Sequence, residues 1–219
     1  MKIDMRIFGS REQWLEARKS YLGGSDASCV LGLNPWKTNV ELWEEKTGRR
    51  TPPDISDSEA VRYGQKAEAS LRQLFKLDYP GMRVSYRREN MWTNDAYPFA
   101  HASLDGWLHD ELGRLGVLEI KTTTISSKAQ SDKWKGRIPD NYFCQVLWYM
   151  GVTNATFAIL QALIRYEIQE KEPSASIQRY RIDRTDEIDE QIRWLMDEGR
   201  KFAEFIKNDT RPPLRLPEV

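Results

Sequence analysis

Residues 117–122 have the sequence VLEIKT, and this stretch decides the fold. Its aliphatic residues predict a buried β-strand, yet Glu119 and Lys121 stand inside it. Side chains two positions apart on a strand point to the same face. Glu119 and Lys121 therefore share one face, and Leu118 and Ile120 share the other. Because burying a charge is costly unless the charge is paired or bound to a metal, the sequence predicts a functional pair on this strand.

A predicted hairpin places a second carboxylate beside this pair. Residues 99–108 and 115–122 are expected to be two strands joined by a glycine-containing turn. Opposed residues of an antiparallel pair have a constant index sum, so a turn centred on Leu112 places Asp105 opposite Glu119. Two neighbouring carboxylates repel each other, and a divalent cation relieves that repulsion. Mg²⁺, which prefers oxygen ligands, fits such a pair.

Two helical residues complete the candidate set. Glu68 lies at the edge of the apolar stripe of a helix predicted over residues 58–77, so we expect it to face inward. Gln145 belongs to a helix predicted within residues 138–151, with Gly151 as the residue that ends it. Each residue alone has an ordinary alternative: a cross-strand ion pair for Glu119 and Lys121, a cap for Glu68, a plain helix position for Gln145. Packing alone does not explain the whole ordered set.

The remaining pattern predicts an α/β or α+β protein in which helices flank one central mixed β-sheet. A short helix is expected to start at Ser25 or Asp26 behind Gly23 and Gly24. Further helices are predicted at 11–19, 38–48 and 185–208, and further strands within 82–92, at 155–164 and at 176–183. Residues 126–137 are predicted to be a basic polar loop, and residues from about 210 onward a tail.

The composition narrows the class of protein. The 219 residues are 40% hydrophobic, which is enough for a sizeable core. Lys and Arg total 33, as do Asp and Glu, so bulk charge does not favour a polyanionic partner, although a neutral chain can concentrate cations in one groove. The two cysteines cannot hold a four-thiolate iron–sulfur cluster. Without an apolar run that would span a bilayer or form a signal peptide, we expect a cytoplasmic protein with no membrane partner.

SLDG at 103–106 and GVLEIKT at 116–122 resemble the PD-(D/E)xK nuclease superfamily, with Leu104 in place of the usual proline. More narrowly, the chain resembles the phage lambda exonuclease and YqaJ-type viral recombinase nucleases. The resemblance covers residues 14–153 and consists of six segments in the family's order: WLEARKSYLGGSDASCVLG, NPWKTNVELWEEKTG, YGQKAE, HASLDGW, GVLEIKT and YFCQVLWYMGVT. It implies a restriction-endonuclease-like core and one nuclease domain over residues 1–219, with a short tail at about 210–219.

The resemblance also implies roles for individual residues. Asp105, Glu119 and the Ile120 backbone carbonyl would hold a metal, Glu68 would bind or orient a second metal, Lys121 would activate water, Gln145 would support the site, and Arg18 and Ser25 would hold a 5′ phosphate. Two Mg²⁺ ions per site are implied, with Mn²⁺ able to substitute. Elementary chemistry agrees for the phosphate, because Ser25 stands at an expected helix start and Arg18 can clamp a phosphate with two donors.

The implied activity is a Mg²⁺-dependent 5′-to-3′ exonuclease acting on double-stranded DNA ends that carry a 5′ phosphate. It would release 5′ mononucleotides and leave 3′ overhangs for phage-type recombination by single-strand annealing. The family also implies a ring-shaped homotrimer, an annealing-protein partner, and a phage or prophage origin in a bacterial host. Two alternatives stay open: an endonuclease of the same superfamily, which would cut closed circular DNA, and a non-catalytic DNA-end binding module. Lys128, Lys133, Lys135 and Arg137, with Trp134 among them, either contact the DNA backbone or form a solvated loop.

Overall fold

A five-stranded mixed sheet forms the centre of the computed structural model, which describes residues 2–167 and 174–216. The strand order is β2-β5-β6-β7-β8, in which β6 and β7 run parallel and the other neighbours run antiparallel. The strands are β2 (Arg83–Ser85), β5 (Gly106–His109), β6 (Leu115–Ile125), β7 (Phe157–Tyr166) and β8 (Ser174–Asp183). The predicted fold class is thus confirmed.

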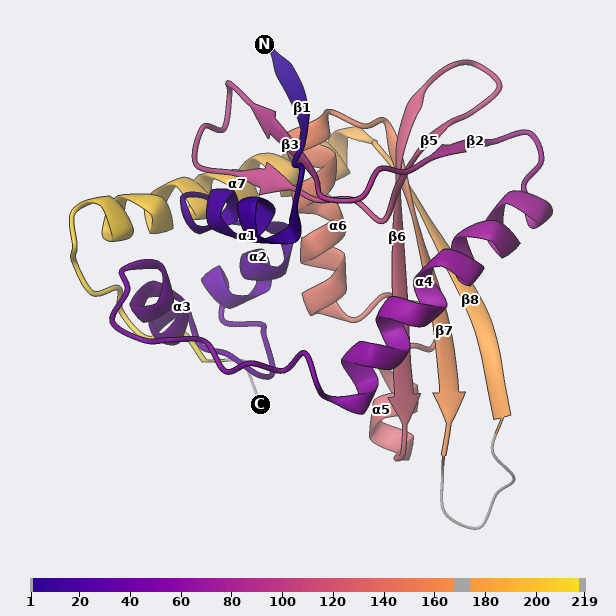
Figure 1. Cartoon of the computed structure of the whole chain (residues 1–219), viewed down its shortest axis with the longest axis horizontal. Helices are drawn as coiled ribbons and strands as arrows, with labels where there is room; N and C mark the ends of the chain where they lie inside the picture. Colours follow the sequence, from indigo (N-terminus) through magenta and orange to yellow (C-terminus); the bar gives the residue numbers. More distant parts are fainter. Residues whose placement is uncertain (1, 168–173, 217–219) are drawn as a thin grey trace.

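Two helices cover opposite faces of this sheet (Figure 1). Helix α4 (Glu59–Asp78) packs Leu71 and Phe75 against Leu118 and Ile120 of β6. Helix α6 (Asp140–Thr153) covers the other face, where Val117 of β6 belongs to the larger apolar core. The alternation predicted for residues 117–122 therefore holds, and it leaves Glu119 and Lys121 on the α6 side.

A smaller antiparallel sheet, of order β1-β3-β4, lies beside the first. It consists of β1 (Ile3–Ile7), β3 (Asn90–Asn94) and β4 (His101–Ala102). The sequence pattern did not predict β1. It also predicted a single strand over residues 99–108, and this was wrong: β4 belongs to the small sheet and β5 to the large one, so Ser103–Asp105 cross from one sheet to the other.

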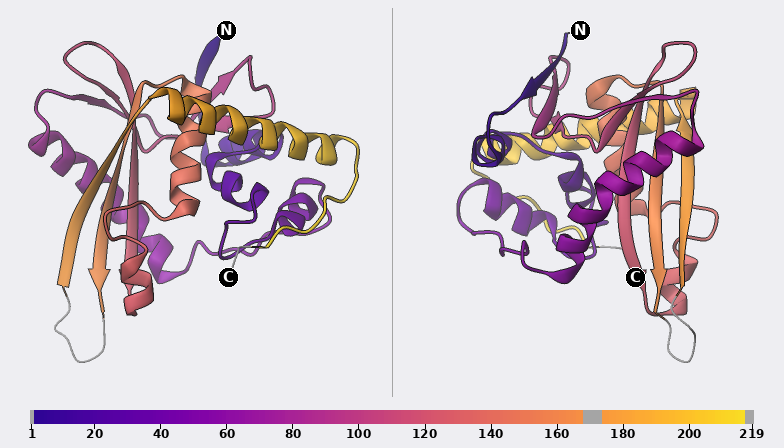
Figure 2. Two further views of the ribbon diagram at one scale, coloured as in Figure 1. Left: turned by 180° about the vertical axis from the view of Figure 1, so that it is seen from behind. Right: turned by 45° about the vertical axis from the view of Figure 1, so that its right-hand side comes forward.

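The remaining helices lie on the α6 side of the sheet, apart from the short α5 (Figure 2). They are α1 (Arg11–Lys19), α2 (Gly24–Val30), α3 (Asn39–Lys46), α5 (Lys128–Asp132) and α7 (Asp186–Lys207). Ser10 caps α1, and Thr38 and Glu41 form a capping box at the start of α3. A bilayer crossing needs a longer or more apolar helix than any found in residues 2–167 and 174–216.

Three predicted helix boundaries need correction. Helix α2 begins at Gly24, one residue before the expected start, and Gly23 is its N-cap. Helix α6 begins at Asp140 instead of at residue 138, and Pro139 is its N-cap. Gly151 lies inside α6, where an added Cβ would lie 3.0 Å from Ile192 Cγ2 of α7, so the glycine permits close helix packing instead of ending the helix. The C-cap is Asn154, with a left-handed φ of 55°.

The predicted basic loop contains a buried aromatic residue and the short helix α5. Trp134 is only 5% exposed and packs against the rings of Tyr142 and Tyr180. Its carbonyl also accepts a hydrogen bond from the Tyr180 hydroxyl at 2.7 Å. Trp134 therefore belongs to the core, and the basic segment around it is not a fully solvated loop.

Candidate active site

The candidate site begins where pairing along one edge of β6 ends. Strand β5 pairs with β6 only from Leu115 to Leu118, and Gly106 lies opposite Leu118. The same register places Asp105 opposite Glu119, as the index sum predicted. Asp105 takes the role of the missing strand partner, because its Oδ2 accepts a hydrogen bond from the Ile120 backbone N–H at 2.8 Å.

Glu119 lies at the centre of a closed polar network and is only 2% exposed. Its Oε1 is 2.7 Å from the Lys121 ammonium and accepts a hydrogen bond from Gln145 Nε2 at 2.9 Å. Gln145 also accepts from Lys121 at 2.9 Å, while its Nε2 contacts the Tyr149 hydroxyl at 2.9 Å. The second oxygen of Glu119, Oε2, is buried without a hydrogen-bond partner in the part of the chain that the structure describes. Buried polar atoms are rarely left unpaired, so this oxygen marks a place for a ligand.

Glu68 reaches the same region from α4, on the side predicted by its helical position. An arginine that the sequence analysis did not single out, Arg72, donates from Nη2 to Glu68 Oε1. Arg72 also donates from Nε to the Asp105 backbone carbonyl at 2.6 Å, and its guanidinium lies 3.7 Å from the Tyr86 ring centroid. The four-residue spacing of Glu68 and Arg72 is the sequence signal that could have found it.

Burial controls the ionisation of this cluster. Burial raises the pKa of Glu119 to about 8, and the nearby charge of Asp105 adds to the effect. Burial and the same charge raise the pKa of Glu68 to about 7. Burial also raises the pKa of Asp105. Burial alone would lower the pKa of Lys121, but the charges of Glu119 and Asp105 outweigh it and raise the pKa instead. Lys121 is therefore held as a cation among buried carboxyl groups.

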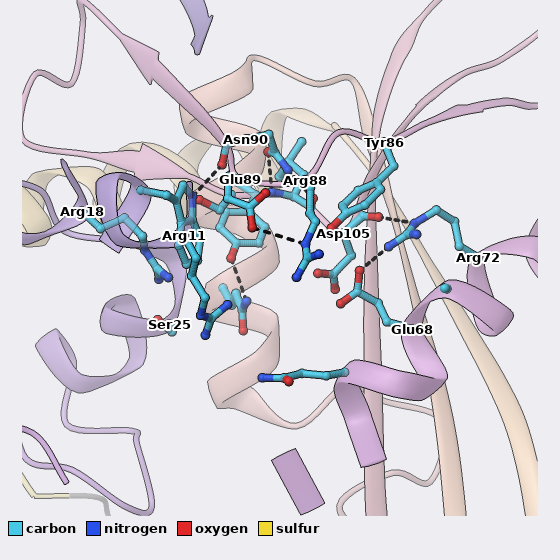
Figure 3. A pocket seen from close by; sticks show the side chains of 17 residues that line it. Arg11, Arg18, Ser25, Glu68, Arg72, Tyr86, Arg88, Glu89, Asn90 and Asp105 are labelled. Carbon is cyan, nitrogen blue, oxygen red and sulfur yellow. Dashed lines mark hydrogen bonds and ion pairs between the residues drawn. The ribbon is translucent and has the colours of Figure 1, made fainter. Parts of the chain in front are cut away.

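Two adjoining cavities meet at the carboxyl groups. The larger, of about 600 Å³, has the basic residues Arg11 and Arg18 with Ser25 on one side and Glu68 and Asp105 on the other (Figure 3). The smaller, of about 290 Å³, runs along β6 and α4. The two cavities share four lining residues, Glu68, Asp105, Gln145 and Tyr149. The structure thus brings all eight predicted site residues into two connected cavities, with Arg18 and Ser25 on one side of the larger one and Glu68 and Asp105 on the other.

The cationic side is built on α1 and α2. The Arg18 guanidinium lies 4.2 Å from the Trp14 ring centroid, and Trp14 Nε1 donates to the Asn90 carbonyl at 3.0 Å. Ser25 is the second residue of α2. Gly24 lets α2 approach α6 closely, because an added Cβ would lie 2.3 Å from the Tyr149 ring. Helix α2, which carries Ser25, therefore packs directly against Tyr149, a lining residue of both cavities.

The acidic side offers separate carboxylates instead of a ready-made metal cluster. Across residues 2–167 and 174–216, no three His, Cys, Asp or Glu side chains converge as a metal-binding group. Arg72 and Lys121 each contact one carboxylate oxygen, on Glu68 and Glu119 respectively. Mg²⁺ commonly uses only one or two protein carboxylates and keeps several waters. Asp105 and Glu119, with the unpaired Glu119 Oε2, fit that kind of ligand set.

The chain matches one protein family and one curated relative in sequence. The family model of the YqaJ-like viral recombinase domain matches residues 13–156. The uncharacterized protein YqaJ of Bacillus subtilis (strain 168) is 38% identical over 157 residues, which are 69% of this chain and 46% of that protein. The chain therefore spans about half the length of this curated relative.

Solved structures of exonucleases have the same fold. The alkaline exonuclease LHK-Exo from Laribacter hongkongensis superposes with a TM-score of 0.59 at 18% identity, covering 90% of this chain and 97% of that one. Its complex with dAMP gives a TM-score of 0.61 at 19% identity over the same shares. A phage-related exonuclease from Haemophilus somnus 129PT gives 0.53 at 13% identity, covering 86% and 96%. With the family model matching well over half of its residues, this chain belongs to the YqaJ-like viral recombinase domain family.

Proposed function

We propose that this protein is a Mg²⁺-dependent exonuclease that degrades double-stranded DNA 5′ to 3′ from 5′-phosphorylated ends. It would release 5′ mononucleotides and leave 3′ single-stranded overhangs. The observation that carries the proposal is the buried Glu119 carboxylate, which contacts Lys121 and Gln145 through one oxygen and has its other oxygen unpaired. A cation site next to a fixed ammonium group suits phosphodiester hydrolysis, because both can stabilise the charge that develops on the phosphate.

Asp105 and Glu119 are the proposed ligands of a first metal, with the Ile120 carbonyl as a third. In a strand, the N–H and C=O of one residue point to the same side. Because the Ile120 N–H reaches Asp105 at 2.8 Å, its C=O is expected on the side of the carboxylates. Glu68 is proposed to bind or orient a second metal. A bound divalent cation would lower the pKa of a coordinated water and offset phosphate charge, and Mn²⁺ is expected to substitute for Mg²⁺.

Lys121 and Gln145 are proposed to align the attacking water. The Lys121 ammonium, held by Glu119 and Gln145, can orient that water and stabilise charge that develops on the phosphate. The water oxygen bonds to phosphorus, the bond from phosphorus to the 3′ oxygen of the terminal nucleotide breaks, and that oxygen leaves with a proton. The products are a 5′ mononucleotide and a strand that carries a new 5′ phosphate.

The cationic side of the large cavity is proposed to bind the 5′ phosphate of the terminal nucleotide through Arg18 and Ser25. Arg18 supplies a forked donor held against Trp14, and Ser25 adds a hydroxyl at the start of α2. Each cut regenerates a 5′ phosphate, so the same contacts would serve every cycle. The solved LHK-Exo complex contains dAMP, the class of product that this reaction would release.

Two further proposals rest on the family resemblance. The protein would form a homotrimeric ring around DNA, and it would supply overhangs to a single-strand annealing protein. A ring that encircles the DNA would prevent the enzyme from dissociating between cuts. Such a ring does not need a positive net charge, and this chain has a net charge of zero. A monomeric variant is then expected to lose processivity.

Digestion of end-labelled linear duplexes tests the activity. Duplexes with 5′-phosphate or 5′-hydroxyl ends are incubated with Mg²⁺ or EDTA, beside covalently closed circular DNA. Lys121→Ala serves as the active-site variant, and Lys207→Ala, at an exposed position in the last turn of α7, serves as its matched control. We expect Mg²⁺-dependent release of mononucleotides from 5′-phosphorylated ends by the wild-type protein and the control, but not by Lys121→Ala.

Other results would redirect the proposal. Cutting of the circles would identify an endonuclease. Binding of duplex ends without cleavage in the presence of Mg²⁺ would identify a non-catalytic DNA-end binding module.

A further inference from the structure

The chain that carries Asp105 is held by side chains instead of by neighbouring strands. Ser103–Asp105 cross from the small sheet to the large one. The Asn90 amide satisfies both backbone groups of Leu104, accepting from its N–H and donating to its carbonyl, each at 2.9 Å. The next carbonyl, that of Asp105, accepts from Arg72 Nε at 2.6 Å. The position of the Asp105 backbone therefore depends on these two side chains, while its carboxylate accepts from the Ile120 N–H of β6.

Arg72 links Asp105 to a second carboxylate. While Nε contacts the Asp105 carbonyl, Nη2 of the same guanidinium donates to Glu68 Oε1. Glu68 lies on α4 and Asp105 lies before β5, so one planar group fixes the helix relative to the strand. Arg72 is only 7% exposed, and Tyr86 supports the face of its guanidinium at 3.7 Å.

The geometry requires arginine. The guanidinium carries its donors in a rigid planar fork, which can contact a carboxylate and a carbonyl in two fixed directions while it stacks on a ring. A lysine keeps the charge but presents one compact ammonium on a flexible stem. Its ammonium cannot hold Glu68 and the Asp105 carbonyl in the same relation.

We propose that Arg72 is a positioning residue of the metal site: it sets the separation of Glu68 and Asp105, and it acts on the reaction only through them. This inference rests on the proposed function, in which both carboxylates serve a divalent cation. Mutation of a residue that contacts and orients the metal ligands typically weakens metal binding by about 10- to 100-fold.

Arg179 provides a matched control. It lies on β8 and contacts Asp78, at the C-terminal end of the helix α4 that carries Arg72. Its Nε donates to Gln161 Oε1 at 2.7 Å, its Nη2 pairs with Asp78 of α4, and its guanidinium lies 5.4 Å from the Tyr79 ring centroid. The arginine thus has a carboxylate, a carbonyl oxygen and an aromatic ring as partners, as Arg72 does, but it lies outside both active-site cavities.

The experiment measures Mg²⁺ binding by isothermal titration calorimetry without DNA, for wild type, Arg72→Lys and Arg179→Lys. Melting temperatures are recorded for all three. We expect Arg72→Lys to bind Mg²⁺ about 10- to 100-fold more weakly, and Arg179→Lys to bind it as the wild type does even where the two variants lose similar stability. Tyr86→Leu removes only the ring beneath the guanidinium, and we expect it to weaken Mg²⁺ binding less than Arg72→Lys does. It replaces Arg72→Lys in the comparison if that variant does not fold.

Nuclease assays give an independent readout. Excess Mg²⁺ is expected to restore cleavage by Arg72→Lys but not by Lys121→Ala. Unchanged Mg²⁺ affinity in Arg72→Lys, or an equal loss in Arg179→Lys, would overturn the positioning role. A wild-type protein that binds Mg²⁺ but cuts no DNA would overturn the proposed function alone, since the binding comparison would still decide the role of Arg72.

Discussion

Gly24 occupies a position where any side chain would collide with the active site. A Cβ added there would lie 2.3 Å from Cε1 and 2.8 Å from Cζ of Tyr149. Carbon atoms in contact are normally about 3.5–4.0 Å apart, so Gly24→Ala requires a shift of about 1 Å. Tyr149 is only 6% exposed, and its hydroxyl is tied to Gln145 by a hydrogen bond of 2.9 Å. Either the ring moves against Gln145, or α2 moves and carries Ser25 with it.

Both movements have a measurable consequence. Overpacking of a filled core typically destabilises by about 1–3 kcal/mol, which for a chain of this size lowers the melting temperature by about 2–4 °C per kcal/mol. A displacement of about 1 Å among groups that align substrate costs about 100-fold in rate. We therefore expect Gly24→Ala to remain folded but to lose most of its nuclease activity.

The assay compares thermal melting and duplex digestion for Gly24→Ala and Gly9→Ala. At Gly9 an added Cβ meets only Gln13 Oε1, at an ordinary 3.4 Å, so little change is expected. The double variant Gly24→Ala/Tyr149→Leu lacks the ring with which the added Cβ collides. The stability losses of the two single variants should therefore add up to more than the stability loss of the double variant. Wild-type stability and rate in Gly24→Ala, or strictly additive losses, would refute the reasoning.

Three further predictions concern the charged groups. Lys121→Met is expected to lower the cleavage rate by about 10²- to 10⁴-fold, while calorimetry still detects Mg²⁺ binding. Arg18→Gln should lose the preference for 5′-phosphate over 5′-hydroxyl ends in competition digests, with little change on 5′-hydroxyl substrates. Burial, reinforced by the charge of Arg18, lowers the pKa of His101 to about 3. Because the unfolded chain takes up this proton near pH 6.5 and the folded chain does not, His101 alone lowers the stability by about 2 kcal/mol between pH 7 and pH 5, while the raised pKa values of Glu119 and Glu68 act in the opposite direction. Urea titrations of wild type and His101→Gln at the two pH values isolate the histidine, and the loss from pH 7 to pH 5 should be about 2 kcal/mol larger in the wild type.

The acidic side of the site could be predicted from local rules. The two-residue period of a strand placed Glu119 and Lys121 on one face, and the constant index sum of a hairpin placed Asp105 opposite Glu119. Helical spacing turned Glu68 inward. These rules need only the type of each element and the position of one turn, so they do not depend on how the rest of the chain packs.

Contacts between distant segments follow no such rule. The composition of residues 126–137 predicted a basic polar loop, yet Trp134 fills a space against β8 that only the assembled sheet creates. The spacing of Glu68 and Arg72 permits an ion pair, but the second bond of Arg72 goes to a backbone carbonyl 33 residues away. That carbonyl is accessible only because the chain changes sheets at Ser103–Asp105. A residue that positions a site by contacting backbone is therefore hidden from sequence periodicity, and Arg72→Lys is a direct way to measure how much such a contact contributes.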